Sequence, residues 1–143
     1  MAQTYDEAVQ ELSAYARAQW AAAGGIAANL TYEDHDFDPP ASKTSWARLV
    51  IKHFSGGKSL GSGTSAVYRR RGQLTLQIFT AIGEEGPGAV GARQLGGPIV
   101  QNMESVGAVG NIWFRNSVMK EIGVDGVWYQ VHVQTDFTYD RTT

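Results

Sequence analysis

The chain has 143 residues, a length typical of a single domain that buries about 70% of the surface exposed by its unfolded form. Its 43% hydrophobic and 18% charged residues indicate a globular chain, and the formal net charge of -2 argues against a general nucleic-acid coat. The lack of cysteine excludes disulfides, thiolate chemistry and Cys-ligated zinc, and we expect neither an export signal nor a membrane-spanning segment.

The N-terminal segment predicts a helix over Thr4–Ala23. Thr4 followed by Glu7 has the spacing of a capping box, in which each side chain bonds the other residue's backbone N–H. Gly24-Gly25 is expected to end the helix. One apolar stripe recurs at helical spacing and should face the core: Tyr5, Val9, Leu12, Ala16 and Trp20.

The middle of the chain predicts strands separated by loops. We expect a short strand at Ala28–Glu33, a loop at Asp34–Ser45, a strand at Trp46–Phe54 and a flexible Gly- and Ser-rich loop at Ser55–Ala66. A long strand, Val67–Ile82, follows and pairs with the preceding strand as an extended hairpin. Its alternation places these side chains on one apolar face: Leu74, Leu76, Ile78 and Ile82.

A second helix is expected at Pro87–Glu104, after a Gly-rich acidic turn. Gly96-Gly97-Pro98 interrupts the pattern, so the sequence predicts a kink or two short helices. The inner stripe of this helix consists of Ala92, Leu95, Ile99 and Met103.

The C-terminal third predicts a long hairpin that turns at Asp125-Gly126. Each arm is about 13 residues, or roughly 43 Å at ~3.3 Å per residue, which is too long for a small domain to cover alone. Part of the ribbon is therefore expected to contact another subunit. The turn sets these pairs: Val124 with Val127, Ile122 with Tyr129, Val118 with Val133, Met119 with His132, Arg115 with Asp136, and Phe114 with Phe137.

The order of helix, strands, helix and hairpin predicts an α+β fold in which two helices pack on one face of an antiparallel or mixed sheet with long hairpins. Residues 1–143 are expected to form one domain.

Several short motifs resemble ligand sites but lack the required context. Gly57-Lys58-Ser59 resembles a phosphate-binding loop, yet Lys52 stands where the motif requires its first glycine, and a strand follows instead of a helix. The stretch Gly61–Ala66 loosely matches a dinucleotide fingerprint, but it precedes a strand rather than following one. Neither match supports nucleotide binding.

The acidic loop Glu33–Asp38 contains His35 and could in principle bind a hard cation, although a solvated turn explains it as well. His53 and His132 lie on predicted strands and have the context of sheet-surface histidines. The sequence contains no motif for nucleophilic, metalloprotease or paired-carboxylate chemistry. We therefore expect no enzymatic activity, no metal and no cofactor.

Arg69, Arg70 and Arg71 form the single basic cluster. These arginines could contact DNA phosphates, form salt bridges to a neighbouring subunit's acidic loop at Glu84 and Glu85, or lie solvated at a strand entrance. Strand alternation sends Arg69 and Arg71 to one face and Arg70 to the other, which argues against a single phosphate-binding stripe. Inter-subunit ion pairs are the preferred interpretation.

Nearly the whole chain resembles the tail terminator proteins of long-tailed bacteriophages, also called tail-completion or head–tail joining proteins. The resemblance begins with the N-terminal helix and a loop that carries Phe37 and Pro39-Pro40 ahead of a strand. It continues through Arg71-Gly72, a Gly-rich turn and a helix to a final strand that begins at Trp128-Tyr129. The alternating apolar positions that carry it are Leu74, Leu76, Ile78, Phe79, Val131 and Val133.

The resemblance implies a virion structural protein, made in the host cytoplasm, that forms a hexameric ring on the head-proximal end of the tail tube. Such a ring stops tube polymerisation and binds the tail tube protein and the head–tail connector or stopper. Double-stranded DNA passes through its centre without sequence-specific contact, and no membrane is involved. The family has no catalytic residues to carry over.

A mobile loop is expected to contact the tube or the connector, since glycine-rich, apolar-poor segments often order on docking. It comprises Gly56, Gly57, Lys58, Ser59, Leu60, Gly61, Ser62, Gly63 and Thr64. Two alternatives stay open: another tail subunit, such as a tube or tail-tip protein, and a small soluble ligand-binding or enzymatic domain.

Overall fold

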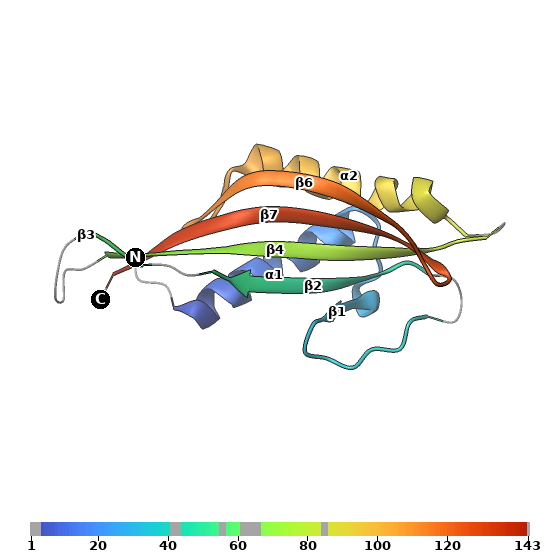
Figure 1. The fold of residues 1–143 in the computed structure, drawn as a ribbon, viewed down its shortest axis with the longest axis horizontal. Helices are drawn as coiled ribbons and strands as arrows, with labels where there is room; N and C mark the ends of the chain where they lie inside the picture. The colour runs from blue at the N-terminus through green and yellow to red at the C-terminus, as the bar shows by residue number, and fades with distance from the viewer. Residues whose placement is uncertain (1–3, 41–43, 55–56, 61–66, 84–85, 143) are drawn as a thin grey trace.

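The structure is a computed structural model that describes residues 4–40, 44–54, 57–60, 67–83 and 86–142. It has the predicted α+β architecture, with two α-helices against one mixed sheet (Figure 1). The elements are α1 (Tyr5–Ala22), the 3₁₀ turn η1 (Ala27–Asn29), β1 (Leu30–Tyr32), β2 (Trp46–His53), β3 (Gly57–Leu60), β4 (Val67–Ala81), α2 (Gly88–Val106), β5 (Ala108–Val109), β6 (Ile112–Asp125) and β7 (Trp128–Thr142).

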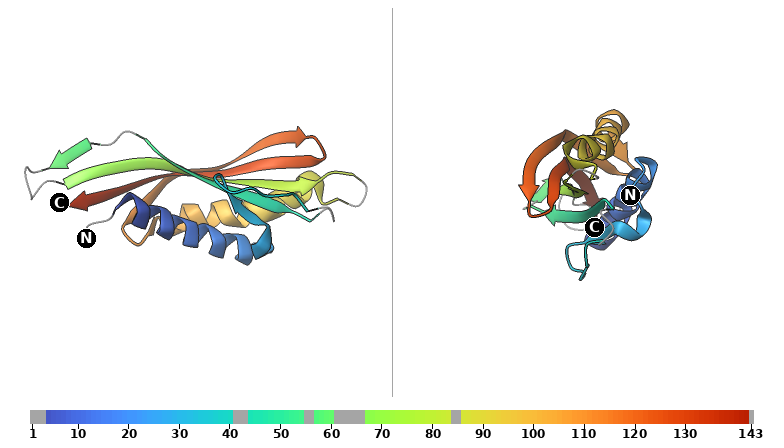
Figure 2. Two further views of the ribbon diagram at one scale, coloured as in Figure 1. Left: turned by 90° about the horizontal axis from the view of Figure 1, so that it is seen from below. Right: turned by 90° about the vertical axis from the view of Figure 1, so that its right-hand side faces the viewer.

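The sheet has the strand order β1-β2-β4-β7-β6-β5, and β3 pairs with β4 beside this path. β1 is parallel to β2 and every other pair is antiparallel, which makes the sheet mixed. Both helices lie on the same face, and no helix of the described chain covers the other face (Figure 2). We call this second surface the open face.

The helix α1 begins as the sequence predicts. The Thr4 hydroxyl accepts from the Glu7 backbone N–H at 3.1 Å, and the Glu7 carboxylate accepts from the Thr4 N–H at 2.9 Å, which completes the capping box. Tyr5 and Val9 of the expected stripe are not buried, and Ala8 takes their place. The buried stripe is therefore Ala8, Leu12, Ala16 and Trp20.

The core lies between the helices and the even-numbered side chains of β4. Leu74, Leu76 and Ile78 are buried as expected, and Ile82 lies beyond the end of the strand. The register places Thr135, Val133 and Val131 of β7 beside these three residues. This shared apolar face holds the helices on the sheet.

The helix α2 is one continuous helix rather than two short ones. Pro98 lies inside it, and Gly96 approaches the sheet so closely that an added Cβ would lie 2.8 Å from the Met119 sulfur and 3.2 Å from a Val133 methyl. The packed sheet face thus stabilises a helix whose sequence alone favours an interruption. Three residues of the predicted inner stripe are buried, Ala92, Ile99 and Met103, and Leu95 is half-buried.

The C-terminal hairpin exists, but its turn is one residue later than predicted. Asp125 pairs with Trp128, so Gly126 and Val127 form the turn. Two register shifts in β6 then bring the strand back to the predicted pairs of Phe114 with Phe137 and Arg115 with Asp136. Each shift coincides with a positive φ, 109° at Gly123 and 58° at Asn116, as expected of β-bulges.

The predicted pairs between the turn and the second bulge are wrong. Val118 was predicted opposite Val133 but lies opposite Gln134. His132 was predicted opposite Met119 but lies opposite Lys120. The bulges thus change the cross-strand partner of each side chain between them. The same shift places Val124, not Ile122, opposite Tyr129, and removes the predicted pair of Val124 with Val127.

The predicted flexible loop contains a strand. Gly57–Leu60 forms β3 and pairs antiparallel with the start of β4, which extends past the end of β2 and would otherwise lack a partner on that side. The rest of the loop lies outside the described residues. β3 and the turn of the β6–β7 hairpin lie at opposite ends of the molecule (Figure 1).

Candidate assembly surface

The arginine cluster at the start of β4 divides between the two faces, as alternation predicts. Arg69 lies on the open face and forms a two-pronged ion pair with Asp140 of β7, at 2.8 and 3.0 Å. The hydrogen bond from Arg69 lowers the pKa of the Asp140 carboxyl. Arg69 therefore has a carboxylate partner within its own chain, and an inter-subunit ion pair at this residue stays a prediction.

Arg70 lies on the helix-covered face. Its guanidinium lies 4.1 Å from the centre of the Tyr5 ring and donates to the Tyr5 hydroxyl. These contacts join the start of α1 to the start of β4. Arg70 thus contacts Tyr5 within its own subunit, and its inter-subunit ion pair likewise stays a prediction.

Arg71 is the arginine of the cluster that stays exposed with no ion pair inside the described part of the chain. It lines a hollow of about 280 Å³ on the open face, together with Arg69, Arg115 and Asp136. The predicted partners Glu84 and Glu85 lie outside the described residues, so their pairing with the arginine cluster stays a prediction.

The expected contact loop is described only at Gly57, Lys58, Ser59 and Leu60. This strand lies directly beside the arginine cluster, with Gly57 opposite Arg69 and Lys58 opposite Tyr68. Gly56, Gly61, Ser62, Gly63 and Thr64 lie outside the described residues.

His53 lies under the N-terminus of α1 in an aromatic cluster that the sequence did not indicate. Its Nε2 lies 2.8 Å from the Tyr139 hydroxyl, and its ring packs edge-on against Tyr5 at 4.6 Å. Burial, together with the positive charge of Arg70, lowers the pKa of His53. Burial also raises the pKa of Tyr139 to about 12.

We expect His53 to make stability depend on pH. Because its folded pKa lies below the unfolded value of about 6.5, the unfolded chain binds the proton more readily. The free energy of unfolding should therefore be highest above about pH 7 and fall as the pH drops through that unfolded value and below it. Urea titrations between pH 5 and 8 should show a shallower dependence in His53→Asn.

The matched control for this measurement is His35→Asn, since His35 is exposed. Burial, followed by the charge of Lys120, also lowers the pKa of His132, so part of the slope should persist in His53→Asn. An unchanged slope in His53→Asn would contradict the assignment.

The two outer edges of the sheet are each only partly paired. On one side β1 pairs with Ala47–Leu49 alone, which leaves the rest of β2 without a described strand beside it. On the other side β5 pairs with Ile112 and Trp113 alone, so the described chain places no strand along β6 from Arg115 to Asp125. Unpaired edges can accept a strand from another chain.

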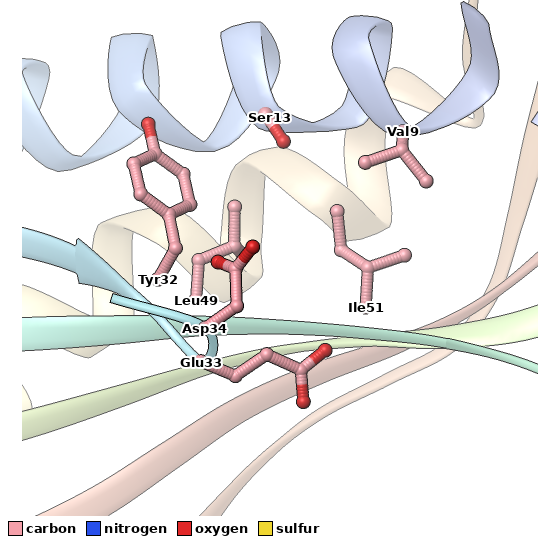
Figure 3. Close-up of a pocket in the computed structure, with 7 residues that line it drawn as sticks. All are labelled: Val9, Ser13, Tyr32, Glu33, Asp34, Leu49 and Ile51. Carbon is pink, nitrogen blue, oxygen red and sulfur yellow. The ribbon is translucent and has the colours of Figure 1, made fainter. Parts of the chain in front are cut away.

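A groove runs along the β2 edge beneath α1 (Figure 3). Its volume is about 380 Å³. Leu49 and Ile51 point from β2 toward the helix, while Val9 and Ser13 face them from α1. Tyr32, Glu33 and Asp34 complete the lining. The groove therefore combines an apolar floor with an acidic rim.

The β6–β7 hairpin exposes apolar side chains at and near its turn. Val124 and Val127 are 68% and 67% exposed, and Ile122 is 52% exposed. The predicted register paired Ile122 with Tyr129 and Val124 with Val127, and the later turn and the bulge at Gly123 replace both pairs. The sequence signal for these bulges was the presence of Gly123 and Asn116, because both residue types tolerate a positive φ.

The acidic loop gives no sign of a cation site. Asp34 lies 3.3 Å from His35, and Glu33 pairs with Lys52 at 2.7 Å. Within the described ranges no three His, Asp or Glu side chains gather closely enough to hold a metal ion. Neither helix of the described chain is both long and apolar enough to cross a membrane.

Comparison with known proteins bears on the fold alone. No protein-family model and no curated protein matches the sequence. A solved structure whose name states no activity aligns with a TM-score of 0.51, over 91% of this chain and 94% of that chain, at 14% sequence identity. A likeness at that identity supports the α+β arrangement of helices on a curled mixed sheet.

Proposed function

We propose that this chain is a virion structural protein that caps the head-proximal end of a phage tail tube as a closed, hexameric ring of identical subunits. The ring ends tube polymerisation and presents a surface to the head connector, and DNA passes through it. The observation that carries the proposal is the pair of unlike, partly unpaired edges on opposite sides of one sheet. A ring requires two different complementary surfaces on each subunit.

The two edges are complementary in chemistry. One carries the groove with an apolar floor and the acidic residue Asp34, beside Glu33, which pairs with Lys52. The other carries exposed Ile122 and Val124, with the exposed cation Lys120 close by on the same strand. Placing the hairpin of one copy in the groove of the next would bury the apolar groups and bring opposite charges together. Every copy would both donate a hairpin and receive one.

Electron microscopy of the chain with purified tail tubes tests this function. We expect a single ring at one end of each tube, and tubes carrying it should not lengthen when tube protein is added. A chain that stacks in many copies along the tube would instead be a tube subunit. A chain that stays monomeric and ignores tubes would contradict the ring and favour a small ligand-binding domain.

A further inference from the structure

A row of side chains near the β3 end of the open face carries an exposed aromatic ring at each end. The backbone N–H of Phe54 donates to the Arg71 carbonyl, Arg71 lies opposite Thr138, and Thr138 lies opposite Trp113. Phe54 is 53% exposed and Trp113 is 48% exposed. Three interstrand spacings of about 4.8 Å separate the two rings by roughly 14 Å, which is the length of about four extended residues.

The hollow on this row, about 280 Å³ in volume, is lined by arginines and by the exposed Phe54. Arg71 and Arg115 both line it, and both are exposed. Neither forms an ion pair within the ranges that the structure describes, whereas Arg69 beside them is neutralised by Asp140. Two guanidinium groups are therefore available to bind an anion.

The carboxylate of Asp136 lines the same hollow. It accepts hydrogen bonds from the side-chain amides of Asn116, at 3.1 Å, and Gln73, at 3.4 Å, rather than from an arginine. The two available guanidinium groups and this one carboxylate leave a single positive charge in excess. That excess suits one carboxylate group, whereas a phosphate chain that crosses the hollow would bring several negative charges close to Asp136.

We propose that this hollow binds an acidic peptide segment of a partner protein. A glutamate or aspartate carboxylate of the segment binds Arg71 and Arg115, because a planar guanidinium can donate two parallel hydrogen bonds to a carboxylate. Large apolar side chains on either side of that acidic residue pack on Phe54 and Trp113, since exposed aromatic rings and arginines supply much of the binding energy of protein interfaces.

This site is separate from the surfaces that form the proposed ring. It shares no residue with the groove beneath α1 or with the exposed apolar residues at the hairpin turn. The inference therefore does not depend on the ring.

Peptide binding to the isolated chain tests the site. The probe is a short fluorescent peptide with the central sequence Trp-Glu-Ser-Leu, and its counterpart has Gln in place of Glu. The parent chain should bind the Glu peptide with a Kd below about 1 mM and at least about tenfold more tightly than the Gln peptide. R71Q/R115Q should bind both peptides equally. R17Q/R93Q, which removes the same charge from the helices, should keep the preference.

Three results of this experiment would overturn the proposal. They are failure of the parent chain to bind the Glu peptide, equal binding of the two peptides by the parent chain, and an equal loss of affinity in the two variants. The last would show that net charge alone attracts the peptide.

Backbone NMR locates the bound peptide without any substitution. The Glu peptide should shift the amide signals of Phe54, Arg71 and Trp113 and leave those of Leu49 and Ile51 in the groove unchanged. Shifts confined to the groove would contradict the assignment. A DNA duplex that displaces the peptide at equal concentration would assign the hollow to phosphates instead. Tube capping is scored separately, so failure of the ring would leave these results unchanged.

Discussion

Replacing Gly72 with alanine should destabilise the protein by about 3 kcal/mol. Gly72 lies in the middle of β4, opposite both His53 and Phe137. An added Cβ would lie 2.3 Å from the Lys52 carbonyl oxygen and 2.3 Å from the Phe137 ring. The ring can turn, but the carbonyl belongs to the paired backbone of β2, so the strands must separate. Equilibrium unfolding in urea measures the change.

The sign of the change in the free energy of unfolding distinguishes a crowded Gly72 from one with free space. At a strand position with free space, alanine instead of glycine would stabilise by roughly 0.5–1 kcal/mol, because it reduces the entropy of the unfolded chain. Gln73→Ala, one residue later on the open face, is the control and should change stability by less than about 1 kcal/mol. A Gly72→Ala protein as stable as the parent would show that β2 and β4 do not approach this closely.

The double substitution I122K/V124K should abolish ring assembly while leaving the fold intact. Both side chains are more than half exposed, so lysine costs little in the free subunit. In the ring they would occupy the apolar floor of the neighbour's groove, where burying two ammonium groups away from the acidic rim is costly. Capping of tail tubes, scored by electron microscopy, should fall at least about tenfold, the factor that corresponds to 1.4 kcal/mol.

Val90→Lys provides the control for assembly. Val90 is 61% exposed on α2 and belongs to neither edge strand. Circular dichroism and urea midpoints should match the parent for both variants. Normal capping by I122K/V124K would remove the hairpin from the interface, whereas loss of capping in Val90→Lys as well would point to a general effect of added charge.

The elements that depend on local chemistry were predictable from the sequence. The Thr4–Glu7 capping box specifies the start of α1 from neighbouring residues alone. Strand alternation correctly separated Arg70 from Arg69 and Arg71, because the period of a strand is fixed. The α+β class followed from the order of such elements.

The features that depend on tertiary contacts were not predictable. Gly96-Gly97-Pro98 favours an interruption, yet close packing of Gly96 on the sheet keeps α2 continuous. In the sequence, Gly123 and Asn116 are the residues that mark the two bulges of β6. Both residue types are also common in loops that contain no bulge, so they do not predict one. The groove arises from α1 and β2, which are distant in sequence, so no local pattern marks it.

The pairing of β4 with β7 continues without a shift from Val67 and Thr142 to Ala81 and Trp128. A force that slides these strands lengthwise past each other loads all of their hydrogen bonds at once. A force that peels them apart from one end meets those bonds one after another. The subunit should accordingly resist stretching along its long axis far better than tearing across it.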